Sequence, residues 1–143
     1  MAKSVSHVGM IRMDQSMDEA FPEIDPGQVP LGSKILVQIK TAKERTAGGI
    51  FLPEDTKDAL QWNTCVAKVI LLGSLAFCNR ETMKPWPEGA WCKVGDFVRV
   101  PKHARDQFEV KAQDGSAVLF ALVNDLELCA KLSCDPRDVL AFV

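Results

Sequence analysis

The chain has 143 residues, of which 47% are hydrophobic and 25% charged, and this suits one ordinary domain. A formal net charge of -2 supplies no overall field for nucleic acid or an anionic membrane. No apolar run approaches the roughly 20 residues that cross a bilayer, so we expect no membrane span. Five cysteines, an odd number, and the absence of a secretory signal pattern around Lys3 and Arg12 predict free thiols in a reducing cytosol.

The first 29 residues form an acidic extension, in which two basic residues stand against five acidic ones. Methionines at helical spacing, followed by Pro22, Pro26 and Pro30, predict a short frayed helix or an extended arm. A disordered tail is the alternative. The acidic residues disfavour a mitochondrial presequence, which would be rich in arginine and poor in acids.

From Pro30 onward, short strand patterns alternate with turn residues, and this is typical of an all-β domain. Residues 34–40 alternate apolar and polar side chains, which predicts a half-buried strand whose edge must be covered. Residues 66–72 are mostly apolar and end at Gly73, which predicts a buried strand closed by a turn.

Three further strand patterns complete the predicted sheet. A turn at residues 94–96 leads into a strand at 97–100. Residues 108–112 and 116–123 flank Asp114–Gly115, which predicts a hairpin with a two-residue turn. Five or more short strands in about 100 residues close most economically into a small barrel.

Two segments, 41–63 and 74–92, fit neither strands nor tight turns. The second is expected to be a long hairpin or loop with several large apolar groups. The first holds a glycine pair and then an apolar triplet, which is either an exposed patch that a partner binds or the next core strand. The pattern alone leaves both readings open. These residues are Gly48, Gly49, Ile50, Phe51 and Leu52.

The sequence offers little for catalysis or metal binding. Cys129 and Cys134 are five residues apart without a second pair, and His7 and His103 are isolated. A nucleophilic Cys or Ser would need a nearby base, and no glycine-rich loop followed by Lys is present for phosphate. We therefore expect no catalytic residue, no metal and no cofactor.

An oligonucleotide-binding barrel is the main alternative function. Basic and aromatic residues could form a face on which single-stranded nucleic acid stacks, although nearby acidic residues favour an ordinary charged loop. The residues of this alternative are Phe97, Arg99, Lys102, Arg105 and Phe108.

Resemblance to a known family favours the first reading of the triplet, an exposed patch that a partner binds. Residues 47–54, which follow a strand at 30–40, look like the mobile loop of the small GroES-like co-chaperonins. Residues 67–73 resemble that family's strand ending in Gly, and 93–98 resemble its Lys-Val-Gly-Asp turn and strand. Residues 124–130 are similar to its closing segment. The blocks occur in the family's order, so together they are more specific than any one alone.

The resemblance implies an irregular β-barrel with a long mobile loop and a roof hairpin. It also implies a homo-oligomeric ring of seven subunits, in which the first strand pairs with a neighbour's closing strand. Such a ring caps a large GroEL-like chaperonin cylinder while a substrate protein folds inside. The loop, with Ile50 and Leu52 as its anchors, would dock on the chaperonin's apical domains. An enzyme, a nucleic-acid partner and a membrane partner are not expected.

The chain also departs from the family pattern. We predict three parts: an extension at 1–29, the barrel at 30–132 and a second extension at 133–143. The tail residues after 138 are apolar, so we expect them to add a strand or cover an interface, and residues 137–141 could match the family ending instead. These departures suggest a divergent member, with a virus-encoded origin as one option. The expected location is the cytoplasm, which would be the host's for a viral protein.

Overall fold

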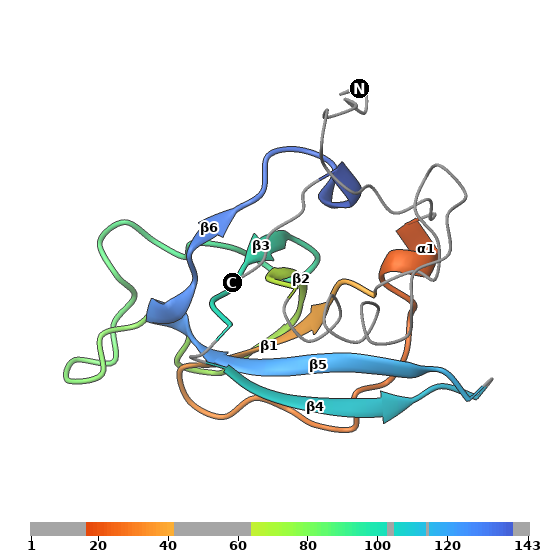
Figure 1. Cartoon of the computed structure of the whole chain (residues 1–143). Coiled ribbons are helices and arrows are strands. Elements are labelled where there is room, and N and C mark those ends of the chain that lie inside the picture. Colours follow the sequence, from red (N-terminus) through yellow and green to blue (C-terminus); the bar gives the residue numbers. More distant parts are fainter. Residues whose placement is uncertain (1–16, 42–63, 103–104, 114, 139–143) are drawn as a thin grey trace.

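A computed structural model of the chain describes residues 17–41, 64–102, 105–113 and 115–138. In this part of the chain, six strands form one sheet in the order β4-β5-β1-β2-β3-β6, and every pair of neighbours is antiparallel. The sheet curls around a single interior (Figure 1). The all-β fold expected from the sequence is confirmed.

The elements are short, as the spacing of turn residues predicts. In chain order they are the helix α1 Met17–Ala20, the strands β1 Lys34–Ile39, β2 Val66–Leu72, β3 Phe97–Arg99, β4 Arg105–Lys111 and β5 Ala117–Asn124, the 3-10 helix η1 Asp125–Glu127, the strand β6 Ala130–Lys131 and the 3-10 helix η2 Pro136–Asp138.

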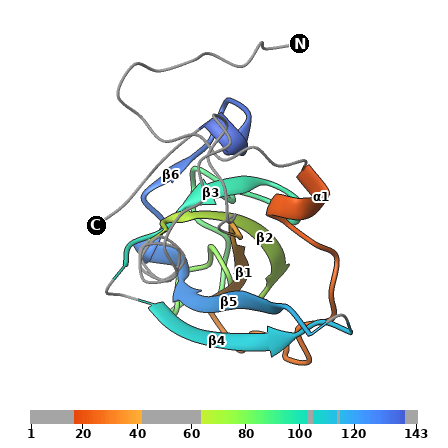
Figure 2. The same cartoon turned by 45° about the vertical axis from the view of Figure 1, so that its right-hand side comes forward.

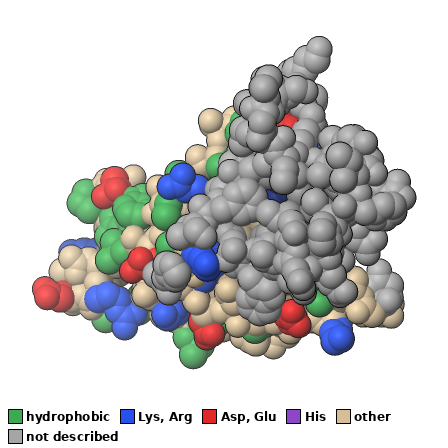
Figure 3. All heavy atoms as spheres, viewed as in Figure 1, with side chains coloured by type: hydrophobic (Ala, Val, Ile, Leu, Met, Phe, Trp, Pro, Cys, Tyr) green, Lys and Arg blue, Asp and Glu red, His purple; other side chains and the backbone are tan. Residues whose placement is uncertain are grey.

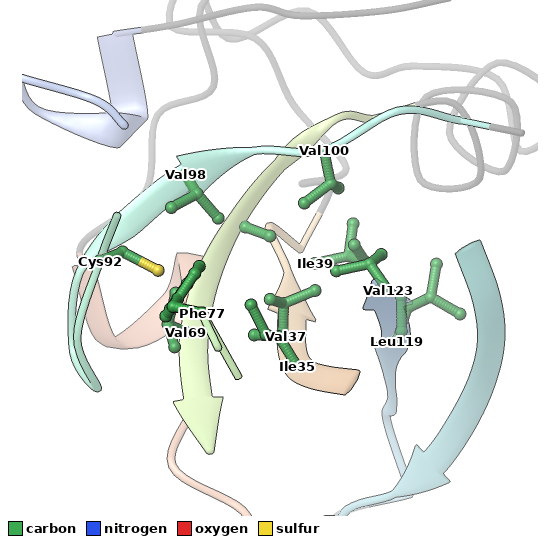
Figure 4. Close-up of a cluster of buried hydrophobic side chains, with 12 residues drawn as sticks. Ile35, Val37, Ile39, Val69, Phe77, Cys92, Val98, Val100, Leu119 and Val123 are labelled. Atoms are coloured by element: carbon green, nitrogen blue, oxygen red, sulfur yellow. The ribbon is translucent and has the colours of Figure 1, made fainter. Parts of the chain in front are cut away.

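The main core lies inside the curled sheet, where alternate residues of the strands point (Figure 4). On β1 these residues are Ile35, Val37 and Ile39, all completely buried. Fully burying an aliphatic side chain of this size contributes roughly 1.5 to 3 kcal/mol. The other strands and the loops contribute Ala67, Val69, Phe77, Cys92, Val98, Val100, Leu119, Ala121 and Val123.

The expected half-buried strand at 34–40 is wrong, because β1 is buried on both faces. Leu36 belongs to a second cluster on the outer face with Phe120, and Ile24 packs against this cluster. Gln38 is buried as well, and its side-chain amide donates a hydrogen bond to the carbonyl oxygen of Pro22 at 2.8 Å. The alternation of apolar and polar residues in β1 does not leave its polar face exposed, because the N-terminal extension covers that face.

The expectation that the edge of this strand needs a partner subunit is also wrong. β1 is central, paired with β5 on one side and β2 on the other. The outermost strands among the described residues are β4 and β6.

Residues 17–29 form an arm on the outside of the barrel. α1 lies beside β2 and β3, and the chain then runs extended along the outer surface to the start of β1 (Figure 2). A short helix and an extended stretch therefore both occur within residues 17–29, whereas the part of the predicted helix with Met10 and Met13 lies outside the described residues. The three-part division at residues 29 and 132 stays a prediction, although the arm packs directly on the barrel.

Two details of the predicted hairpin need correction. β4 begins at Arg105 rather than Phe108. Backbone pairing closes with the amide of Ala112 donating to Ser116, so three residues rather than two form the turn. Gly115 has a φ of +90°, which suits glycine at the left-handed position of a three-residue turn.

Candidate functional site

The five residues predicted to bind a chaperonin, Gly48 to Leu52, lie outside the described residues. The structure does describe where their segment begins and ends. Ile39 and Ala67 are opposite each other in the β1–β2 pair, and the amide of Lys40 donates to the carbonyl of Val66 at 2.9 Å. Residues 42–63 therefore leave and re-enter the barrel at neighbouring positions, at one end of the sheet.

The start of this segment is bonded to residues on both sides of the barrel sequence, Ala20 and Arg137. The amide of Thr41 donates to the carbonyl of Ala20 in α1 at 2.8 Å. Lys40 is 3% exposed, and its ammonium group donates to the carbonyl of Arg137 in η2 at 3.3 Å. A buried ammonium needs such a partner, because desolvation of a charge is costly.

The end of the segment is held by a side chain from β4. Thr64 is buried, and its carbonyl oxygen accepts a hydrogen bond from Nη1 of Arg105 at 2.9 Å. Burial lowers the pKa of the Arg105 guanidinium, which nevertheless stays charged at neutral pH.

Residues 74–92 contain a hairpin, as expected, with Cys78 and Pro85 as its bridging pair. Phe77, Trp86 and Trp91 form an aromatic cluster whose ring centroids lie 4.9 to 6.2 Å apart. Figure 3 shows hydrophobic side chains gathered on the left of that view, over this hairpin.

The hairpin is anchored to the barrel by one carboxylate. Phe77 has a φ of +60°, a conformation rarely adopted by a residue with a side chain. Its amide donates to Oδ2 of the buried Asp125 at 2.9 Å. This contact joins the hairpin to η1, immediately after β5, and favours the unusual turn.

Residues 93–96 form the turn predicted from the Lys-Val-Gly-Asp block. Gly95 has a φ of +95°, and Asp96 accepts a hydrogen bond from the amide of Lys93 at 2.9 Å. This bond, together with the nearby ammonium groups of Lys93 and Lys131, lowers the pKa of Asp96. The carboxylate thereby links the turn to β6.

Besides the hairpin, two further apolar surfaces of the described chain are candidates for contact with a partner. Val29, Leu31 and Leu126 lie near the start of β1 and the end of β5, and they are 73%, 80% and 69% exposed.

The second surface is a groove of about 300 Å³ beside β3 and β6. Its lining residues are Trp91, Cys92, Val98, Leu128, Cys129, Ala130 and Lys131.

The described residues show little chemistry suited to catalysis. Burial raises the pKa of Cys92 to about 11 and also raises that of Cys65, so both remain thiols at neutral pH. Within the described ranges, no three His, Cys, Asp or Glu residues are grouped to hold a metal ion. No helix there is long and apolar enough to span a bilayer.

The structure does not assemble the oligonucleotide-binding face of the alternative reading. Phe97 packs against Phe21 of the arm, with ring centroids 5.1 Å apart. Phe108 stacks on Phe120, with centroids 5.7 Å apart. β3 and β4 are separated by three strands in the sheet, so the two rings belong to different surfaces.

Comparison with known proteins decides the family. The sequence model described as "Chaperonin 10 Kd subunit" matches residues 28–128, most of the chain. The chain belongs to this family. It is a co-chaperonin, and the recognition made from residues 30–132 is confirmed.

Two curated relatives of this co-chaperonin come from different kinds of organism. The mitochondrial 10 kDa heat shock protein of Saccharomyces cerevisiae is 32% identical over 107 residues, covering 75% of this chain and 90% of the relative. The co-chaperonin GroES of Borreliella afzelii is 33% identical over 75 residues, covering 52% of this chain and 67% of the relative. The cytoplasmic location and viral origin stay predictions.

Sequence reasoning missed the contacts that surround segment 42–63 of the co-chaperonin. Nothing in the pattern indicated that the carbonyls of Ala20 and Arg137 bind Thr41 and Lys40. A lysine directly after a strand is usually a solvated residue, so only its burial reveals the contact. The expected role of the tail after residue 138 falls outside the described residues.

Proposed function

We propose that this co-chaperonin assembles as a closed homo-oligomeric ring, of seven subunits as the resemblance implies, and caps a GroEL-like chaperonin. The family match over residues 28–128 carries this proposal. The chaperonin's own ATP cycle would drive folding of the enclosed substrate, and the cap would need no active site.

The two exposed apolar surfaces support ring assembly. A ring needs a head-to-tail contact between two different patches of the subunit. Val29 and Leu31 precede β1, and β6 is an outermost strand with the apolar groove beside it. We propose that the stretch before β1 of one subunit packs along β6 and this groove in the next, which would bury both surfaces.

Replacing Leu31 with Asp tests this interface. Its side chain is 80% exposed in the single chain, so the subunit should keep its fold while the ring dissociates. Native mass spectrometry should show a closed oligomer for the wild type and monomers for Leu31→Asp. Met83→Asp, at an exposed apolar position in the 74–92 hairpin outside both surfaces, is the matched control and should leave the ring intact. A wild-type monomer at micromolar concentration would contradict ring assembly.

We further propose that Ile50 and Leu52 anchor each loop on the chaperonin. Alternate residues of an extended segment point to the same side. Each buried anchor should contribute roughly 1.5 to 3 kcal/mol, whereas ordering each loop residue costs about 1 to 2 kcal/mol. One loop should therefore bind weakly, and several loops on one ring should strengthen binding by about two to four orders of magnitude.

Serine substitutions test the anchors. Ile50→Ser or Leu52→Ser should abolish capture of a GroEL-type chaperonin in the presence of ATP or ADP, with ring mass and melting temperature unchanged. A loss of about 2 to 5 kcal/mol in folding stability would instead place the triplet in the core and refute the anchor role.

A further inference from the structure

Both ends of the described chain contact residues just before the segment that carries the proposed loop. Residues 17–27 and 129–138 both lie outside the family match, which covers 28–128. Each nevertheless supplies a backbone carbonyl to one of the two residues that precede segment 42–63. Both additions therefore contact the same point of the barrel.

The N-terminal contact is embedded in an apolar cluster. Ala20 and Phe21 are 0% and 4% exposed, and they pack with Val66, the first residue of β2. The ring of Phe21 lies 5.1 Å from that of Phe97 on β3. The carbonyl that receives the Thr41 amide is thus held by packing on both of these strands.

The C-terminal contact is organised by its own turn. The carboxylate of Asp135 accepts hydrogen bonds from the backbone amide and Nε of Arg137 at 2.9 and 3.0 Å. This arrangement fixes the turn whose carbonyl receives the Lys40 ammonium. Leu132, which leads into this turn, packs against the same cluster as Phe21.

We propose that these contacts form a collar that positions the start of the chaperonin-binding loop. The collar consists of Ala20, Phe21, Lys40, Thr41 and Arg137. It acts by fixing the direction in which the chain leaves β1, so less conformational freedom remains to be lost when the loop binds. Its role in capture rests on the proposed function.

Paired substitutions on both sides of the collar test this role. Lys40→Met removes the ammonium donor and keeps an unbranched apolar stem, whereas Lys40→Arg retains a donor. Phe21→Ala removes the ring contact, whereas Phe21→Leu keeps most of the apolar volume. The measured quantities are the rate of dissociation from a GroEL-type chaperonin in ADP and the hydrogen exchange of the Thr41 amide in the free ring.

Rings of Lys40→Met and of Phe21→Ala should each dissociate from the chaperonin about three- to tenfold faster than the wild type. Hydrogen exchange of their Thr41 amide should also be faster, and the ring mass should be unchanged. The arginine and leucine variants should restore both rates. If the first two variants do not fold, truncation after Cys134 removes Arg137 while leaving the arm and barrel, and it should also speed dissociation.

Variant rings that are captured and melt at a lower temperature, yet dissociate from the chaperonin at the wild-type rate, would overturn the collar's positioning role. A wild-type ring that no GroEL-type chaperonin captures would refute the proposed function instead. The wild-type measurement therefore separates the two failures.

Discussion

At the scale of single residues, Gly73 shows how closely the backbone packs where β2 ends. A Cβ atom at this position would lie 2.2 Å from the carbonyl oxygen of Gly32 and 2.7 Å from that of Lys34. Both oxygens belong to the backbone, so rotation of a side chain cannot relieve the clash with the added Cβ atom. We predict that Gly73→Ala lowers the free energy of unfolding by about 3 kcal/mol, measured by urea denaturation.

Gly95→Ala is the control for this prediction. Gly95 has a φ of +95°, and a Cβ atom there would meet no described atom within 4 Å beyond its chain neighbours, so only conformational strain opposes the change. That strain should cost about 1 kcal/mol. Equal losses at the two glycines would contradict the steric explanation for Gly73.

Asp96 should make stability depend on pH in the acidic range. Its pKa in the folded chain is held below the ordinary 3.8, first by the amide of Lys93. A lowered folded-state pKa contributes stability above the unfolded pKa, and this contribution is lost as pH falls through the folded value. The wild type should therefore melt above Asp96→Asn at pH 7, and the difference should shrink below about pH 4. A difference that stays constant down to about pH 2 would exclude this linkage.

At the scale of elements, the strands could be predicted from the sequence, whereas the segments that cover their outer faces could not. The strand at 66–72 and the turn at 94–96 are local signals and both occur, although the strand is only partly buried and Leu71 is 36% exposed. Burial of Gln38 and Lys40 depends on Pro22 and Arg137, which are far away in sequence. Alternation alone could not reveal these partners. The predicted site, residues 48–52, rests on the family motif and stays a prediction, because these residues lie outside the described part of the chain.

The hairpin at 74–92 should depend on Asp125. Asp125→Ala would leave the buried amide of Phe77 without its acceptor, at a cost of about 1 to 3 kcal/mol. We expect looser packing of Trp86 and Trp91, seen as red-shifted tryptophan fluorescence and faster proteolysis of the hairpin. Asp125→Asn, which keeps an acceptor oxygen, should preserve both signals. Unchanged fluorescence in Asp125→Ala would show that aromatic packing alone holds the hairpin.

At the scale of the whole molecule, a small all-β barrel, two exposed apolar surfaces and a loop combine into one proposed assembly. A single loop should bind the chaperonin weakly, so strong binding needs several loops on one ring. A ring in turn needs two different contact surfaces on each subunit. The proposed collar adds contacts from outside the family match, because Ala20 and Arg137 bind the two residues that precede segment 42–63. Assembly and capture should therefore be separable, since they use different residues.

The most direct test of the cap is protection of an enclosed substrate. An unfolded substrate protein bound to a GroEL-type chaperonin is treated with protease after addition of ATP and this co-chaperonin. Bacterial and mitochondrial chaperonins should both be tried, since one relative is a mitochondrial protein and the other a bacterial co-chaperonin. We predict that the wild-type ring protects the substrate, whereas Leu52→Ser does not. A wild-type ring that binds the chaperonin yet leaves the substrate fully digestible would contradict the proposed cap.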